Sequence, residues 1–169
     1  MNGVSEQFSQ IYDQYIEKIY RFVYLKVSSQ ETAEDITSKV FLRGWEVYQK
    51  DQANIKNMNA FLYQIARNAV TDHYRENAKT KTVSQDAIPE VVDAKANIYE
   101  KAVLSSDIDA VKVSIQSLKK EYQDVIIWHY LEDMHPEQIA EILDKPAGTI
   151  RVMIHRGLKA LRDQISNEA

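Results

Sequence analysis

Positive charge gathers in one stretch near the C-terminal end of the sequence, where it could bind the phosphates and bases of DNA. Residues 145–162, KPAGTIRVMIHRGLKALR, contain no carboxylate after Gly148, although the whole chain has a formal net charge of -4. Guanidinium and ammonium groups bind phosphate, and guanidinium also matches the edge of guanine. The preceding stretch, residues 132–144, holds five carboxylates and no Lys or Arg. This sorting of charge predicts a basic DNA-binding helix after an acidic one.

The basic stretch has the spacing of a helix with two different faces. Its cations recur at steps of three and four and so share one face, and the apolar residues Ile150, Ile154, Leu158, Leu161 and Ile165 follow the other. The charged face predicts contact with DNA, whereas a merely solvated basic face is the plainer alternative. The residues that we expect to contact DNA are Thr149, Arg151, Val152, His155, Arg156, Lys159 and Arg162.

A short turn separates the acidic helix from the basic one. In DKPAGT, residues 144–149, Gly148 can adopt unusual dihedral angles and Thr149 can cap the following helix. Two helices joined by a tight turn, with the second one basic, indicate a helix-turn-helix. The second helix of such a pair enters the major groove, where its early residues reach base edges and its later cations meet phosphates.

The N-terminal half predicts three more amphipathic helices. The second begins at SSQE, where Ser28 and Glu31 could form a capping box, and a polar loop, residues 49–59, precedes the third. Trp45 and Phe61 lie at helical spacing among apolar residues and are expected in the core. The residues expected to face inward in the third helix are Met58, Phe61, Leu62, Ile65, Ala66, Ala69 and His73.

The composition and the scarcity of glycine and proline predict an all-α protein of two small helical domains. Only four glycines and three prolines occur among 169 residues, too few for a turn-rich β fold. Residues 1–78 form the first expected domain, 79–102 a flexible linker, and 103–169 a second domain, in which Ser117 could cap a helix. The absence of cysteine, of a long apolar run and of a signal-peptide pattern predicts a cytoplasmic protein without membrane insertion.

Three segments in this order resemble motifs of the extracytoplasmic-function (ECF) sigma factors, the compact two-domain members of the sigma-70 family. AEDITSKVFLRGW resembles the helix that binds the polymerase clamp, FLYQIARNAVTDHYR the helix that reads the -10 element, and PEQIAEILDKPAGTIRVMIHRGLKALR the reader of the -35 element. The resemblance covers nearly the whole chain. It implies that region 2 binds clamp and -10 element, and that region 4 binds -35 element and polymerase flap, so that the holoenzyme starts transcription at specific promoters.

The resemblance also implies which residues bind in region 2. Asn68 would read an unpaired base in a pocket formed by the polar loop and the start of the next helix, and Tyr63 would offer a ring face. Arg67 and Arg75 would contact the strand backbone. The full set expected at the -10 element is Asn57, Asn59, Tyr63, Arg67, Asn68 and Arg75, and the set expected at the polymerase is Asp35, Ser38, Lys39, Phe41 and Leu42.

The chain departs from the family pattern at four places. Ser38 and Lys39 replace a frequent Gln-Glu pair, and Asp144 replaces the turn glycine, which Asp can do because it tolerates a left-handed conformation. His129 stands where an arginine commonly helps to hold phosphate. His135 with Pro136 replaces a usual serine cap.

Other classes of function explain the sequence less completely. His73 with Glu76, and a cluster from His129 to His135, could suggest a metal site, but their order reverses the Glu-x-x-His pattern of di-iron helices. We therefore expect no catalysis, metal or cofactor. A helix-turn-helix regulator that does not replace the primary sigma factor is the alternative, although it would not need the FLYQIARN segment. The resemblance implies core RNA polymerase, promoter DNA and an anti-sigma factor as partners.

Overall fold

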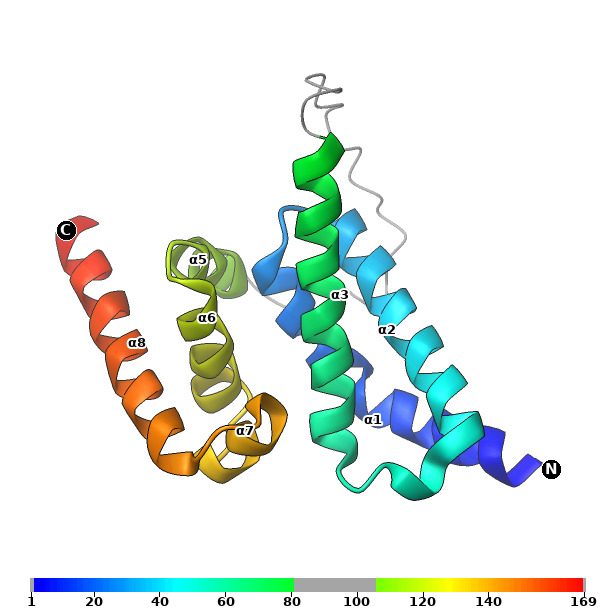
Figure 1. The fold of residues 1–169 in the computed structure, drawn as a ribbon. Helices are drawn as coiled ribbons and strands as arrows, with labels where there is room; N and C mark the ends of the chain where they lie inside the picture. Colours follow the sequence, from blue (N-terminus) through cyan, green and yellow to red (C-terminus); the bar gives the residue numbers. More distant parts are fainter. Residues whose placement is uncertain (1, 81–105, 169) are drawn as a thin grey trace. The chain divides into compact units, whose positions relative to one another are not determined.

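A computed structural model describes residues 2–80 and 106–168, and all regular elements in these two ranges are helical (Figure 1). The all-α class is thereby confirmed. The chain divides into two units, Met1–Val103 and Leu104–Ala169. The predicted linker lies outside the described residues except for Lys79 and Thr80, which complete a helix. No helix in the described ranges combines the length and the apolar character needed to cross a membrane.

Three long helices make up the described part of the first unit. Helix α1 spans Asn2–Lys26, α2 spans Gln30–Asp51, and α3 spans Met58–Thr80, with a short 3-10 turn at Gln52–Asn54. Each helix contacts the other two (Figure 1). Burial of a large apolar side chain contributes about 1.5–3 kcal/mol, so their common core holds the unit together. Its fully buried residues include Ile19, Tyr20, Phe22, Val23, Leu25, Leu62, Tyr63 and Ala66.

The caps of α2 and α3 fix where these helices begin. The Ser29 hydroxyl accepts a hydrogen bond from the Thr32 backbone N–H at 3.1 Å, so the predicted capping box of Ser28 was wrong by one residue. Ser29 has the extended backbone that a cap requires, with φ -139° and ψ 157°. At α3, Asn57 Oδ1 accepts from the Ala60 N–H at 3.0 Å. Asn57 is therefore a helix cap.

The buried side of α3 is rotated from the predicted one. Leu62 and Ala66 are buried as expected, but Ala60, Tyr63 and Val70 are buried as well, and Phe61, Ile65, Ala69 and His73 are half-buried. The rings of Phe22 and Tyr63 pack edge to face, with their centroids 5.5 Å apart. Two neighbouring apolar rows run along α3, and contact with both α1 and α2 buries the row that includes Tyr63 more deeply.

The second unit is built around the last helix. Helix α5 spans Ser106–Gln116, α6 Lys120–Ile126, α7 Pro136–Leu143 and α8 Ala147–Glu168, and a π-helical turn at Ile127–Leu131 continues α6. Helix α8 contacts α5, α6 and α7 (Figure 1). Its buried core includes Ile115, Val125, Ile127, Trp128, Ile139, Ile142, Ile150 and Ile154.

Two predicted caps in this unit were wrong. Ser117 bonds the Ser114 carbonyl at 2.6 Å, and the residue before α6 is Lys119, which makes no side-chain cap. Thr149 lies inside the first turn of α8 because that helix begins at Ala147, directly after Pro146. Proline fixes φ near the helical value and favours such an early start. The Ile150 N–H accordingly donates to the Pro146 carbonyl at 3.2 Å.

The turn between α7 and α8 depends on Asp144. Asp144 has φ 53° and ψ 52°, the left-handed conformation expected when Asp replaces a turn glycine, and this prediction is confirmed. The N–H of Lys145 then donates to the Ala140 carbonyl at 3.1 Å and closes the end of α7. Gly148 has no positive φ, so the expected unusual dihedral angles belong to Asp144 instead.

We expect Gly157→Ala to destabilise the second unit by about 1 kcal/mol, because overpacking outweighs the gain in helix propensity. A Cβ at Gly157 would lie 3.1 Å from Cγ1 and 3.2 Å from Cδ1 of Ile126, which is almost fully buried. Urea unfolding followed by the fluorescence of buried Trp128, in a Trp45→Phe background, measures the change. Gly148→Ala on the same helix meets nothing within 4 Å and serves as the control. Equal stability of both variants would contradict this packing.

Candidate nucleic-acid interface

The outer face of α8 carries every residue that the sequence assigned to the -35 contact. All of these side chains are exposed, whereas Ile150 and Ile154 on the other side are buried. The structure thus separates a charged face from a packed one, as the helical period predicted. Ile165 is 54% exposed, so its predicted place on the packed side was wrong. The adjacent residue, Gln164, reaches Ser117 instead, so this turn of α8 presents a polar side chain to the unit.

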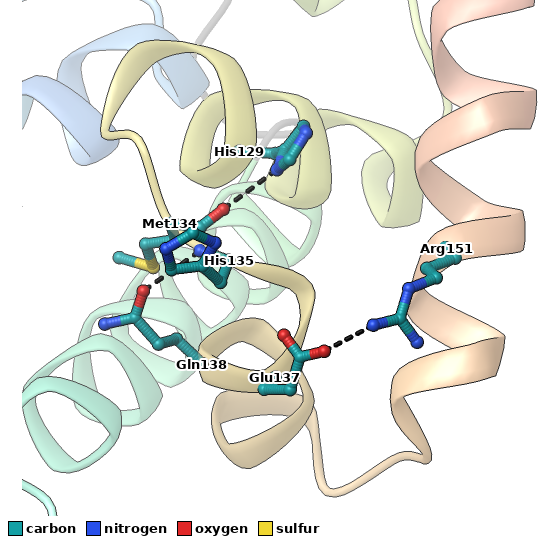
Figure 2. Close-up of polar contacts among 6 residues, drawn as sticks. All are labelled: His129, Met134, His135, Glu137, Gln138 and Arg151. Atoms are coloured by element: carbon teal, nitrogen blue, oxygen red, sulfur yellow. Dashed lines mark hydrogen bonds and ion pairs between the residues drawn. The ribbon is translucent and has the colours of Figure 1, made fainter.

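An ion pair bridges the two helices of the helix-turn-helix. Arg151 Nη2 donates to the carboxylate of Glu137 in the first turn of α7 (Figure 2). The pKa of Glu137 lies below its ordinary value, chiefly because the carboxylate accepts a hydrogen bond from its own backbone N–H, and also because Arg151 is nearby. Both side chains are more than half exposed. Exposed pairs add little stability, so the effect of this pair is to orient the guanidinium.

His129 and His135 stabilise the approach to α7. His129 Nδ1 lies 2.8 Å from the Met134 carbonyl, so this nitrogen carries the proton and donates it (Figure 2). The His135 backbone N–H donates to Gln138 Oε1 at 2.9 Å and closes the first turn of α7. The His129 side chain thus supports the loop before α7, and the His135 backbone is part of the helix cap. Within residues 2–80 and 106–168, no three His, Asp or Glu side chains are grouped to hold a metal ion.

A pocket between α2 and α3 brings Asn68 and Lys39 together, although the sequence assigned them to different binding surfaces. Its volume is about 480 Å³. The polar loop, residues 49–59, supplies none of its lining, so this pocket differs from the one that the resemblance implied for Asn68. Helix α3 carries Asn68 almost three turns after its first residue, too far along for the loop to enclose it. The lining residues are Ile36, Lys39, Arg43, Ile65, Asn68, Ala69, Asp72, His73 and Glu76.

The other predicted -10 residues do not form one surface. Tyr63 is fully buried and offers no ring face to a base, so this prediction was wrong. Asn59 and Asn68 are nine residues apart, which places them on about opposite sides of α3. Arg67 and Arg75 are exposed, and Arg75 lies 3.9 Å from Asp72, beside Asn68 on the helix.

The predicted polymerase-binding residues of α2 separate into an exposed group and one core residue. Asp35 and Lys39 are exposed and paired at 3.1 Å, Ser38 is exposed, and Leu42 is 59% exposed. Phe41 is buried and its ring meets that of Tyr12 edge-on at 4.9 Å, so its assignment to the polymerase was wrong. Leu42 is therefore available for a contact with another protein.

A pattern along α3 in the sequence indicates where the pocket lies. Ile65, Ala69 and His73 recur every four residues, immediately beside Asn68 and Asp72 on α3. The helical period predicts Ile65, Ala69 and His73 in the core, but all three are half-buried and line the pocket. Trp45 and Phe61 are likewise half-buried, and Trp45 packs against Phe8 with ring centroids 5.3 Å apart.

The family models and the relatives that match this chain agree on one protein family. Residues 11–80 match Sigma-70 region 2, and residues 108–161 match Sigma-70, region 4. The ECF RNA polymerase sigma factor SigW of Bacillus subtilis is 30% identical over 171 residues, which cover 96% of this chain and 91% of SigW. The ECF RNA polymerase sigma factor BldN of Streptomyces coelicolor is 25% identical, and the match covers 99% of this chain but 63% of BldN.

Solved structures share the fold. The sigma factor RpoE of Bartonella quintana, in complex with the anti-sigma factor NepR, matches with a TM-score of 0.73 and 20% identity, covering 95% of this chain and 98% of RpoE. CnrH, in complex with the cytosolic domain of CnrY, matches with a TM-score of 0.68 and 15% identity, covering 99% of this chain and 93% of CnrH. Together with the two matched regions and the SigW relationship, this places the chain in the sigma-70 family, as an ECF RNA polymerase sigma factor.

Proposed function

We propose that this sigma factor selects promoters by placing the outer face of α8 in the major groove of the -35 element. The exposed cationic face of α8, opposite the buried Ile150 and Ile154, is the observation that carries this proposal. The early residues Arg151, Val152 and Arg156 lie within reach of base edges, and Lys159 and Arg162 further along meet phosphates. The sigma-factor family replaces the alternative of a helix-turn-helix regulator, and it also makes the protein an initiation factor rather than an enzyme.

The pocket between α2 and α3 is proposed to receive an unpaired base of the -10 element. The half-buried Ile65 offers apolar surface to the base, and the Asn68 amide can both donate to and accept from its edge. Arg43 lines the same pocket and is placed to meet the strand backbone. Asn59 and Asn57 lie elsewhere, and Arg67 and Arg75 are exposed candidates for further phosphate contacts.

The exposed residues of α2 are proposed as the contact with the polymerase clamp. Leu42 supplies the apolar part, and Asp35, Ser38 and Lys39 supply the polar part. We further propose residues 1–78 as the region 2 domain and 103–169 as the region 4 domain, which also contacts the flap. The family regions matched at 11–80 and 108–161 support these limits.

An anti-sigma factor is a proposed regulator. Two structural neighbours, RpoE and CnrH, were solved in complex with NepR and with the cytosolic domain of CnrY. A partner of the same kind would cover surfaces that this chain needs for the polymerase. Because polymerase and promoter are cytoplasmic, we propose that this sigma factor acts in the cytoplasm.

Reconstitution with core RNA polymerase tests the proposed function. The net charge of -4 limits the electrostatic attraction between the isolated chain and DNA, so we expect weak, salt-sensitive binding without polymerase. The holoenzyme is expected to bind promoter fragments tightly and to start transcription at discrete sites. Equally tight promoter binding by the isolated chain in a gel-shift assay would contradict the proposal.

A further inference from the structure

Val152 is an exposed apolar side chain in the middle of the charged face of α8. It is 46% exposed, and Arg151, His155 and Arg156 surround it in sequence. Single exposed apolar residues are common on protein surfaces and need no special explanation. Its position on the helix, however, makes Val152 different from the other exposed apolar residues.

Helical geometry directs Val152 away from the core. At about 100° per residue, Val152 lies about 160° around α8 from both Ile150 and Ile154, which are buried. It is therefore the side chain that projects most directly toward a duplex facing this side of α8. Val152 also lies in the second turn of α8, within the early part of a recognition helix that reaches base edges.

The chemistry of valine restricts what it can contact in a major groove. The edges of the four base pairs present hydrogen-bond donors and acceptors, and one apolar group, the C5-methyl of thymine. An isopropyl group can satisfy no donor or acceptor, so covering one of these removes its water without replacement. Contact with the methyl group instead buries apolar surface on both partners.

Val152 has neighbours that hold the helix in register around such a contact. Arg156 lies one turn further along and about 40° around the helix, where it can pair with a guanine or a phosphate. The guanidinium of Arg151 is oriented from the other helix by Glu137. Cations on both sides of Val152 therefore position the backbone of α8, and the valine side chain can contact the base that lies between them.

Resting on the proposed function of α8, we propose that Val152 selects a thymine in the -35 element by contact with its C5-methyl group. Arg151 and Arg156 anchor the helix, and Val152 favours an A·T pair with its thymine on the contacted strand. This contact predicts that one A·T pair of the -35 element cannot be changed without loss of affinity.

Deoxyuridine substitution tests this contact because it removes the methyl group and keeps the hydrogen bonds. Holoenzyme first selects a -35 hexamer from a randomised promoter library, and each thymine on either strand is then replaced in turn. We expect one replacement to weaken promoter binding by wild-type holoenzyme about three- to fourfold, the value of one buried methyl group. The same replacement is expected to leave binding by Val152→Ala holoenzyme unchanged.

Val113→Ala is the matched control, since Val113 is an equally small apolar side chain that is 69% exposed on a different helix, α5. This variant should keep the full deoxyuridine effect. A selected hexamer in which no deoxyuridine matters, or which contains no A·T pair, would overturn the role of Val152 and leave the -35 proposal standing. Failure to select any upstream hexamer would instead overturn the proposed function of α8.

Discussion

Arg156→Glu holoenzyme is expected to initiate about 100-fold more slowly than wild type at a promoter that depends on its -35 element. Arg156 is exposed on the charged face of α8 that we propose to enter the major groove, and loss of one bidentate base contact costs about 1–3 kcal/mol. The new carboxylate also repels phosphates and base acceptors, which adds to that cost. Run-off transcription at a fixed salt concentration measures the change, because phosphate contacts make affinity depend strongly on salt.

Two controls separate base reading from general loss of charge at Arg156. Arg156→Lys keeps the positive charge but loses the planar fork, so we expect an intermediate loss of about tenfold. A promoter with a scrambled -35 element should give equal rates with wild type and both variants. Substitution of an exposed residue should change stability by less than about 0.5 kcal/mol. Wild-type rates from a normally folded Arg156→Glu protein would contradict the role of α8.

Asn68→Ala is expected to lower initiation about 10- to 100-fold while leaving upstream binding intact. The Asn68 amide lines the pocket between α2 and α3, and a site that hydrogen-bonds a base loses much of its discrimination when those bonds are removed. Permanganate footprinting of open DNA, together with protection of the -35 element, distinguishes the two steps. We expect reduced opening with unchanged upstream protection.

Asn59→Ala provides the matched control for Asn68→Ala. It removes the same amide from the same helix, on about the opposite side. We expect the initiation rate to change less than about twofold, since Asn59 faces away from the pocket and its substitution removes no contact with the base. An abasic nucleotide at the captured position should also abolish the difference between wild type and Asn68→Ala. Equal losses from both amides would show that the pocket does not read the base.

The sequence predicted the charged face of α8, its packed positions Ile150 and Ile154, and the turn before it, because their signals are local. The spacing of cations and isoleucines in α8 fixed both faces of the helix, and Asp144 adopted the left-handed conformation that its place in the turn required. Caps were less predictable. Ser28 and Ser29 are adjacent and chemically identical, so only the backbone path decides which one precedes the helix.

Residues in the first unit were harder to assign because they depend on how three helices pack. Tyr63 and Phe41 have side chains that suit either a core or a binding surface, and contacts with Phe22 and Tyr12 place them in the core. The pocket at Asn68 arises only when α2 docks against α3. No pattern within one helix contains that information.

Site-specific photocrosslinking in the promoter open complex tests the central claim most directly. A photoreactive amino acid at position 156 or at position 68 reports which DNA each unit touches. We predict crosslinks from position 156 to duplex bases of the -35 element and from position 68 to the unpaired nontemplate strand at the -10 element. Crosslinks from position 156 to sequences outside the -35 element, or none from either position in an active open complex, would contradict the assignment of these two surfaces.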